Sequence, residues 1–232
     1  MQRVLVTGAN RGLGLEFVQQ LLARGARVIA ACRQPGRALK LTELAAAHPG
    51  HLHVLPLDLS KERSIAGLAH EAGMLTDRLD ALINNAGVLV SGERYGELAA
   101  KPFAETFATN VIGPLLLTQV LTPLLENGEG ARIVNLSSDL GSHADTVAFN
   151  TPSYAISKAA LNMVTRLTAA ELGARGITVI SLNPGWVRTD MGGARAPLAV
   201  NESVAAMLEV IDGLKPGDGG RFLDYSGADV AW

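Results

Sequence analysis

Tyr154 and Lys158, in the run Tyr154-Ala155-Ile156-Ser157-Lys158, are the residues whose types and spacing point most directly to chemistry. Side chains four positions apart on a helix share one face. A free phenol has a pKa of about 10, too high for efficient proton transfer at neutral pH, and a nearby ammonium lowers that pKa by favouring the phenolate. The pair therefore predicts an acid–base group, although such a pair also occurs by chance in many helices.

A glycine-rich turn, Thr7-Gly8-Ala9-Asn10-Arg11-Gly12-Leu13-Gly14, lies near the start of the chain, between an apolar strand-like run and a helical pattern. In this context Gly8 permits a tight turn, Gly12 lets the backbone approach a pyrophosphate, and Gly14 allows the helix to pack closely on the sheet. The free N–H groups at the helix N-terminus attract phosphates. The turn predicts a dinucleotide site; the alternative is a glycine turn with no ligand.

The residues after the second apolar run bear on which dinucleotide would bind. NAD-binding sites of this kind usually carry an acidic residue there, which holds the ribose 2′-hydroxyl. Here the run Arg27–Cys32 ends in Arg33, no carboxylate occurs before Glu43, and Arg11 lies inside the glycine turn. Two guanidinium groups favour a 2′-phosphate, so we expect NADP(H) in preference to NAD(H).

The elements that must position these residues alternate between short apolar runs and helical patterns. The runs lack strict alternation, as expected of strands covered on both faces. They are Arg3–Val6, Arg27–Cys32, His51–Leu57, Ala81–Ile83, Arg132–Leu136, Thr178–Leu182 and Arg221–Leu223. The pattern predicts an α/β protein: one doubly wound (Rossmann) domain over residues 1–232, with a seven-stranded parallel sheet flanked by helices.

Two helical stripes and three loops complete the predicted arrangement. One helix carries Leu15, Val18, Leu21 and Leu22 on one side, and another carries Ile156, Ala160, Met163, Val164 and Leu167 at helical spacing. The loops Gly92–Pro102, Gly141–Pro152 and Gly192–Asn201 follow the carboxyl ends of strands. Ligands bind at that edge of open α/β sheets, so the substrate site is expected among these loops.

With these motifs in place, the chain resembles the short-chain dehydrogenase/reductase family over nearly its whole length. Thr7–Gly14 is similar to the family's TGxxxGxG turn, and Tyr154 with Lys158 is similar to its YxxxK pair. The other matching segments, in the family's order, are Asn84-Asn85-Ala86-Gly87, Asn110, Ser137-Ser138 and Asn183-Pro184-Gly185. Six motifs in sequence are far more specific than any one of them.

The resemblance implies a role for each matching residue. Tyr154 would exchange a proton with the carbonyl or alcohol oxygen, Ser138 would position that oxygen, and Lys158 would bind the nicotinamide ribose and depress the tyrosine pKa. Asn110 would hold a water that links Lys158 to solvent. The remaining cofactor contacts would come from Gly8, Asn10, Arg11, Gly12, Leu13, Gly14, Arg33, Asp58, Leu59, Asn85, Ala86, Gly87, Pro184, Gly185, Val187 and Thr189.

The spacing of the serine departs from the family pattern. Tyr154 follows Ser138 by sixteen positions, a few more than in many members, and the extra residues fall in His143–Thr151. Ser142 is therefore an alternative to Ser138, which is preferred because it directly ends a strand. A narrower resemblance to carbonyl reductases of the sniffer and C-factor type rests on Cys32-Arg33, Thr189-Asp190-Met191-Gly192-Gly193 and Phe222-Leu223-Asp224-Tyr225.

Composition excludes several other classes of protein. The formal net charge of −2, without clustered basic residues, argues against a nucleic-acid partner. The apolar run Val111–Leu125 is expected to be too short and too broken to span a membrane. His51 and His53 lack a third ligand, so no metal site is predicted.

A strand-like start and a lone cysteine, Cys32, predict a cytoplasmic protein. The family resemblance implies a homodimer or homotetramer.

Two functions remain open. The first is an NADP(H)-dependent reductase of a small aldehyde, ketone or diketone, with the alcohol as its product. The second is a signalling or regulatory protein that keeps the fold and binds the nucleotide with little turnover, which the resemblance to C-factor proteins makes a real alternative. The combined presence of Ser138, Tyr154, Lys158 and Asn110 favours the enzyme.

Overall fold

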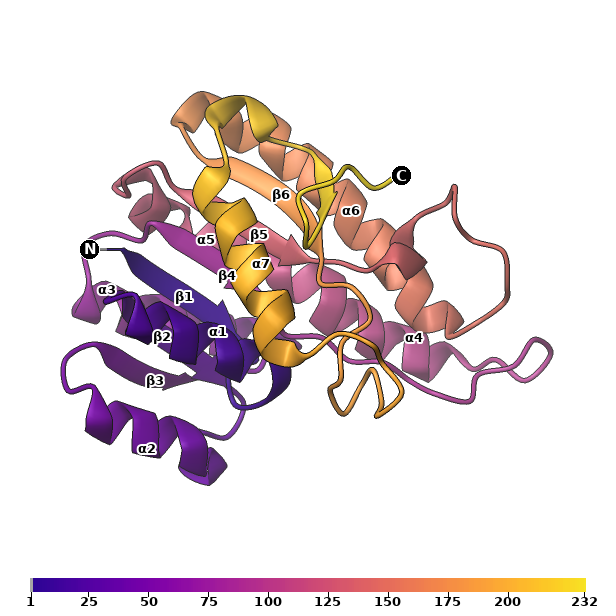
Figure 1. Cartoon of the computed structure of the whole chain (residues 1–232), viewed down its shortest axis with the longest axis horizontal. Helices are drawn as coiled ribbons and strands as arrows, with labels where there is room; N and C mark the ends of the chain where they lie inside the picture. The colour runs from indigo at the N-terminus through magenta and orange to yellow at the C-terminus, as the bar shows by residue number, and fades with distance from the viewer. Residues whose placement is uncertain (1) are drawn as a thin grey trace.

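A computed structural model describes residues 2–232 and contains one parallel sheet with the strand order β3-β2-β1-β4-β5-β6-β7 (Figure 1). The strands are β1 (Arg3–Thr7), β2 (Arg27–Cys32), β3 (Leu52–Pro56), β4 (Ala81–Asn84), β5 (Arg132–Leu136), β6 (Thr178–Asn183) and β7 (Phe222–Asp224). Every neighbouring pair is parallel. The predicted fold class and all seven strands are confirmed, with ends that differ from the prediction by only a residue or so.

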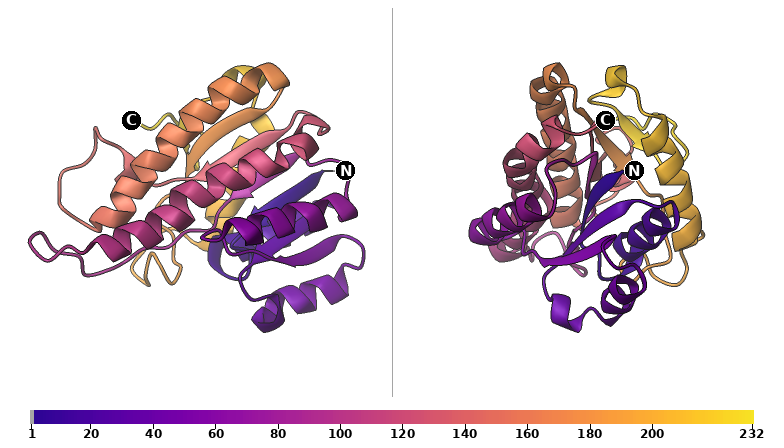
Figure 2. Two further views of the ribbon diagram at one scale, coloured as in Figure 1. Left: turned by 180° about the vertical axis from the view of Figure 1, so that it is seen from behind. Right: turned by 90° about the vertical axis from the view of Figure 1, so that its left-hand side faces the viewer.

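Helices cover both faces of the sheet (Figure 2). They are α1 (Gly12–Ala23), α2 (Leu39–Ala47), α3 (Glu62–Leu75), α4 (Ala100–Phe107), α5 (Gly113–Glu126), α6 (Pro152–Leu172) and α7 (Val200–Gly213). Buried residues of α1, α2 and α7 form one apolar cluster with the sheet, and those of α3, α5 and α6 form a second cluster on the opposite face. The result is the three-layer arrangement expected of alternating strands and helices.

The strand order places the predicted site residues at one edge of the sheet. From β1 the chain winds outward to β2 and β3, then returns to β4 on the other side of β1. The connections that follow β1 and β4 therefore run in opposite directions and leave a crevice at the carboxyl ends of these two strands. Open α/β sheets bind their ligands in such a crevice. The long connections after β4, β5 and β6 leave from this same edge, as predicted.

The apolar residues at helical spacing on α6 do not form its buried face. Ile156, Met163 and Leu167 are exposed. The face that packs on the sheet carries small polar residues instead, among them Asn162 and Thr165. Polar side chains can be buried there because each is hydrogen-bonded: Thr165 to polar side chains of β5 and β6, and Asn162 to the segment that follows β5.

The apolar run around Val111–Leu125 also differs from its prediction. Ala100–Glu126 forms one continuous helical stretch through a π-helical turn, and it is long and apolar enough to cross a membrane by length and composition alone. Half of its most apolar window is buried in the protein. Leu117, Leu121 and Leu125 are fully buried in the apolar cluster beneath the sheet, so packing accounts for the composition of this helix.

Candidate active site

The glycine-rich turn joins β1 to α1 and lies against the segment that follows β4. Gly8 has a φ of +64°, and a Cβ there would lie 2.8 Å from the Cα of Ala86. A Cβ at Gly14 would lie 2.3 Å from the carbonyl oxygen of Gly8. Both glycines are therefore required by close approach within the turn, and the helix N-terminus at Gly12 follows directly.

Asn85 holds these two segments together. Its Nδ2 donates to the carbonyl oxygens of Thr7, at 2.7 Å, and Gly8, at 3.2 Å. The backbone N–H of Ala86 donates to the Thr7 hydroxyl at 3.0 Å. The Asn85 side chain is thus engaged within the protein, which leaves the backbone of Ala86 and Gly87 for any contact with a ribose.

Tyr154 and Lys158 share the buried face of α6, as their spacing predicted. The ammonium nitrogen of Lys158 lies 5.4 Å from the centre of the Tyr154 ring and donates to the carbonyl oxygen of Leu136 at 2.6 Å. Both side chains are almost completely buried. The end of β5 therefore fixes the lysine beside the tyrosine.

The pKa of Tyr154 corrects an expectation. Burial raises the pKa of the phenol to about 12, the Ser138 hydroxyl acts in the opposite direction, and the Asp139 carboxylate raises it further. Burial also lowers the pKa of Lys158 to about 8. The expected depression of the tyrosine pKa by the lysine is absent in the chain without cofactor, because losing water disfavours the charged form of both groups. Tyr154 is a protonated phenol at neutral pH.

The two candidate serines occupy different settings. Ser138 lies just beyond β5, and its hydroxyl is close enough to Tyr154 to influence the pKa of the phenol. Ser142 is buried, and its hydroxyl accepts a hydrogen bond from the backbone N–H of Asp145 at 3.2 Å. Ser142 therefore organises the following loop, and the geometry favours Ser138 as the serine that acts beside Tyr154.

Asn110 is completely buried in the π-helical turn Ala108–Ile112. Its Oδ1 accepts from the N–H of Val88 at 2.8 Å, and its Nδ2 donates to the Val88 carbonyl oxygen at 2.9 Å and to the Ser157 hydroxyl at 3.0 Å. Asn110 Oδ1 and Lys158 Nζ also approach one point, 3.5 and 3.7 Å from the position of a Cβ on Gly87. Asn110 thus connects the segment after β4 with the helix that carries the tyrosine.

The two arginines predicted at the 2′-phosphate differ in their surroundings. Arg33 is exposed directly after β2, and it makes no ion pair with any of residues 2–232. Arg11 is also exposed, but it pairs with Asp190 at 2.8 Å across the crevice. Arg33 is the cation that is free to meet a phosphate, whereas Arg11 must first leave its partner.

Asp58 and Leu59, which the family resemblance places at the adenine ring of the cofactor, differ in their surroundings. Asp58 is partly exposed, and its carboxylate accepts from the Ser60 hydroxyl at 2.6 Å, which holds the pKa of that carboxyl below its usual value. The Leu59 side chain is buried and packs against Gly113, where a Cβ would lie 2.6 Å from that of Leu59. Only the backbone of Leu59 is therefore left to contact an adenine.

The segment after β6 reaches back to the glycine turn. Gly185 has a φ of +77° and lies against the Tyr225 ring, and the Pro184 carbonyl accepts from the Ser203 hydroxyl at 2.7 Å. Val187 is buried, and the side chain of Thr189 comes within 3.6 Å of the position of a Cβ on Gly12. Thr189 thus lies next to the glycine-rich turn. Within that turn, Asn10 is exposed and Leu13 is partly buried against the core.

Sequence reasoning missed a buried polar network that supports the site. Asn84 Nδ2 donates to Asn135 Oδ1 at 2.9 Å, Asn135 Nδ2 donates to Thr165 Oγ1 at 2.9 Å, and the Ser181 hydroxyl donates to the same oxygen at 2.8 Å. It also missed Asp139, which contacts Ser138. The only signals were polar residues inside otherwise apolar strands and the adjacency of Asp139 to the serine.

Together these residues place a phenol beside an ammonium, a hydroxyl near the phenol, and a glycine-rich turn at a helix N-terminus, with an arginine nearby that has no ion pair among residues 2–232. Among residues 2–232, no three His, Cys, Asp or Glu side chains gather as metal ligands would. The chemistry that fits is proton transfer beside a bound dinucleotide.

Comparison with known proteins agrees with this arrangement. Residues 2–197 match the family model described as short chain dehydrogenase. The chain is similar to the C-signal protein of Myxococcus xanthus, with 42% identity over 164 residues that cover 71% of this chain and 99% of that protein.

Two solved structures are similar over the full length of the chain. The NADPH-bound carbonyl reductase from chicken fatty liver shares 41% identity with a TM-score of 0.94, covering 100% of this chain and 99% of the other. The carbonyl reductase Sniffer of Drosophila melanogaster shares 33% identity with a TM-score of 0.95, covering both chains completely.

Proposed function

The chain belongs to the short-chain dehydrogenase family, within its sniffer and C-signal-like group, and on that premise we propose that it is an NADP(H)-dependent oxidoreductase that reduces a small aldehyde, ketone or diketone. The observation that carries the proposal is geometric: the buried Tyr154 phenol lies beside Lys158, whose Nζ is 5.4 Å from the ring centre and is fixed by the Leu136 carbonyl. A phenol that stays protonated at neutral pH can donate its proton to a carbonyl oxygen as that oxygen gains negative charge.

Each of the four candidate catalytic residues has a separate proposed role. The bound cofactor supplies the hydride. Tyr154 gives its proton to the substrate oxygen, and Ser138 lies beside the phenol where it can help to position that oxygen. Lys158, held by the Leu136 carbonyl, is placed to bind the nicotinamide ribose. Asn110 fixes the backbone at Val88, next to Gly87, and so shapes the wall of the crevice beside the lysine.

The cofactor is held by the segments around the crevice. The backbone at Gly8, Gly12 and Gly14 is proposed to receive the pyrophosphate at the N-terminus of α1. Arg33 is proposed to bind the 2′-phosphate because no carboxylate lies between β2 and Glu43, and because its guanidinium forms no ion pair within the described part of the chain, residues 2–232. Similar structures with bound NADPH support this cofactor preference.

The experiment is loss of NADPH absorbance with a panel of aromatic aldehydes and diketones, using the natural chain and Tyr154→Phe. We expect kcat/KM to fall by roughly a thousandfold, in line with the loss of a general acid, while the Kd for NADPH stays within about twofold. An equal loss of NADPH binding would contradict the role given to Tyr154, since the phenyl ring keeps the packing of the residue.

The second candidate is a nucleotide-binding signalling protein with little turnover, and the 42% identity to the C-signal protein favours its consideration. The same assay separates the two. Tight NADPH binding without turnover of any carbonyl in the panel would favour the signalling protein.

Assembly and location stay predictions. A homodimer or homotetramer through the central helices is supported by exposed apolar side chains on α5 and α6, namely Leu115, Ile156, Met163 and Leu167. Sedimentation of the purified chain tests this prediction. The cytoplasmic location rests on the sequence alone.

A further inference from the structure

Helix α6 begins without a cap from its own sequence. Thr151, the residue before the helix, makes no side-chain capping hydrogen bond, and its φ of +39° lies in the left-handed region that β-branched residues rarely adopt. Among residues 2–232 its buried hydroxyl oxygen has no hydrogen-bond partner. Pro152 has no N–H, and Ala155 is the first residue of the helix whose N–H bonds back along the chain, to the Thr151 carbonyl at 2.9 Å. The N–H of Ser153 therefore needs a partner from outside the helix.

Glu93, from the loop after β4, is that partner. Its Oε2 accepts from the N–H of Ser153 at 3.2 Å and from the Ser153 hydroxyl at 2.8 Å. Ser153 itself is completely buried. A carboxylate is also the favoured charge at a helix N-terminus, where the aligned peptide dipoles leave a partial positive charge. The cap of α6 thus comes from a residue that lies 60 positions before Ser153.

A second contact joins the loop of Glu93 to the loop that leads into α6. The rings of Tyr95 and Phe149 meet edge to face, with their centroids 5.5 Å apart and an angle of 88° between the ring planes. Edge-to-face contact is a favoured geometry for aromatic rings. Both loops extend from the same end of the molecule, beyond α4 and α6 (Figure 1). The aromatic pair therefore helps to keep Glu93 within reach of the helix.

We propose that Glu93 is a positioning residue of the active site: its carboxylate caps α6 from outside the helix and so fixes the first turn, which carries Tyr154. Helix ends fray, and Tyr154 directly follows Ser153, so opening of this turn moves the phenol. A displacement of about 1 Å is enough to slow a reaction that depends on alignment. The kinetic consequence rests on the proposed function, whereas the capping contact does not.

Amide hydrogen exchange followed by NMR tests the cap. In Glu93→Ala the amides of Ser153 and Ala155 are expected to exchange roughly tenfold faster or more, because hydrogen bonds to a charged acceptor are lost from the first turn. Amides in the middle of α6 should keep their rates. First-turn rates equal to those of the natural chain would overturn the inference.

Glu97→Ala is the matched control. Glu97 is an exposed carboxylate of the same loop, and within residues 2–232 its side chain forms no hydrogen bond or ion pair. Its removal should leave the exchange rates of α6 and kcat unchanged. Faster exchange of the Ser153 amide to the same extent in Glu97→Ala would show that the charge of the loop, and not the contact of Glu93, protects the helix.

Steady-state kinetics test whether the cap serves Tyr154. Glu93→Ala is expected to lower kcat roughly tenfold while the Kd for NADPH stays within about twofold, because the glycine-rich turn is untouched. Glu93→Gln keeps an oxygen that can accept from Ser153, so it should restore most of kcat. An unchanged kcat in Glu93→Ala, or an equal loss in Glu93→Gln, would refute the positioning role.

A double substitution separates positioning of the phenol from a wider loss of structure. In a Tyr154→Phe background, Glu93→Ala should have little further effect on the residual rate, because the group that it positions is already gone. A further tenfold loss would count against the inference. Exchange needs no turnover, so a chain that reduces no carbonyl but opens at Ser153 in Glu93→Ala would contradict the proposed function and leave Glu93 as the cap of α6.

Discussion

At the scale of single residues, burial decides the state of the active-site groups. Tyr154 and Lys158 lie side by side, yet the pKa of the phenol rises to about 12 and that of the amine falls to about 8. Both shifts oppose charge, which is what removal of water does to an acid and a base alike. The four-residue spacing on α6 brings the two groups together, but their protonation states are set by the loss of water on burial.

Arg33 is the residue proposed to give the preference for NADPH over NADH. Arg33→Ala is expected to raise the Kd for NADPH roughly tenfold or more and to leave the Kd for NADH nearly unchanged, because a charge-assisted contact to phosphate contributes about 1.5–3 kcal/mol. Fluorescence titration with both nucleotides measures the change.

Arg37→Ala is the control for that measurement, since Arg37 is also exposed and follows β2 in the short 3₁₀ helix Pro35–Arg37. Its effect on NADPH binding should be much smaller. A ratio of NADPH to NADH affinity that does not move in Arg33→Ala would refute the 2′-phosphate assignment.

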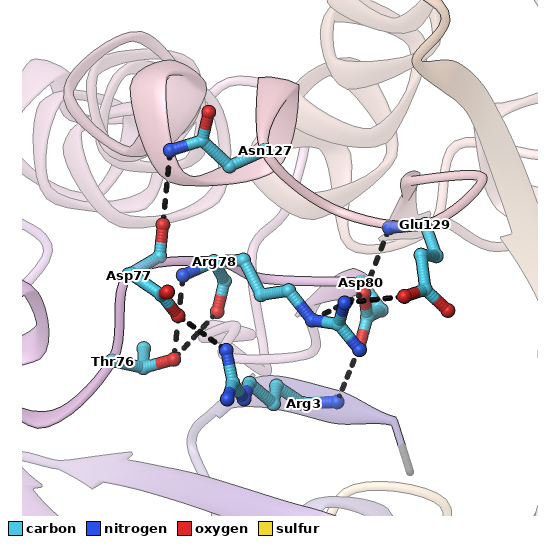
Figure 3. Close-up of polar contacts among 7 residues, drawn as sticks. All are labelled: Arg3, Thr76, Asp77, Arg78, Asp80, Asn127 and Glu129. Carbon is cyan, nitrogen blue, oxygen red and sulfur yellow. Dashed lines mark hydrogen bonds and ion pairs between the residues drawn. The ribbon is translucent and has the colours of Figure 1, made fainter.

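At the scale of elements, Asp80 connects segments at the amino-terminal ends of the strands, opposite the candidate active site (Figure 3). Asp80 directly precedes β4. Its carboxylate accepts from the N–H of Arg3 at 2.7 Å and from that of Glu129 at 2.9 Å, and it lies 3.6 Å from Arg78 Nε. One buried carboxylate thus ties the start of β1 to the turns before β4 and β5.

Asp80→Asn is expected to lower the free energy of unfolding by about 2–3 kcal/mol, because the single oxygen of the amide cannot accept from both N–H groups and the buried amide loses the charge that attracts Arg78. Urea denaturation measures the loss. Asp77→Asn provides the comparison: Asp77 pairs with Arg3 but its side chain is 86% exposed, so its loss should lower the free energy of unfolding far less than the loss of Asp80. Equal losses from the two substitutions would show that burial of Asp80 is unimportant.

The glycine turn shows how elements constrain one another. A Cβ at Gly8 would collide with Ala86, and a Cβ at Gly14 would collide with the turn itself. The close packing of β1, α1 and the segment after β4 therefore requires glycine at both positions. Asn85 joins the same three pieces by hydrogen bonds. The conformation of the glycine-rich turn therefore depends on tertiary contacts as well as on its local sequence.

At the scale of the whole molecule, Lys158 links active-site chemistry to stability. Its pKa in the folded protein, about 8, lies below the 10.5 of an ordinary lysine. Between these values the unfolded chain binds more protons, so the free energy of unfolding rises with pH in that window. Tyr154 acts in the opposite direction above about pH 10, because its pKa is raised on folding.

Lys158→Met removes the first of these effects. From pH 7 to pH 10 the natural chain should gain about 2 kcal/mol of stability relative to the variant, since each pKa unit corresponds to about 1.4 kcal/mol. Urea denaturation at a series of pH values measures both proteins. Parallel stability curves would mean that Lys158 keeps its ordinary pKa in the folded chain.

The architecture could be predicted from the amino-acid sequence, and the proposed site residues could be named from it. Seven apolar runs between helical patterns specified the sheet, because burial on both faces demands such runs. The spacing of Tyr154 and Lys158 placed both on one face of α6, and the carboxyl ends of the strands gathered the motifs at one edge. These features follow from local periodicity and chain order, which a sequence carries directly.

The surroundings of the proposed site residues could be seen only in the folded chain. The buried face of α6 is polar, Arg11 pairs with Asp190, and the Leu59 side chain packs in the core. The direction of the Tyr154 pKa shift also depended on burial. Desolvation and hydrogen bonding depend on which atoms from distant segments surround a group, and spacing along the chain does not encode those neighbours.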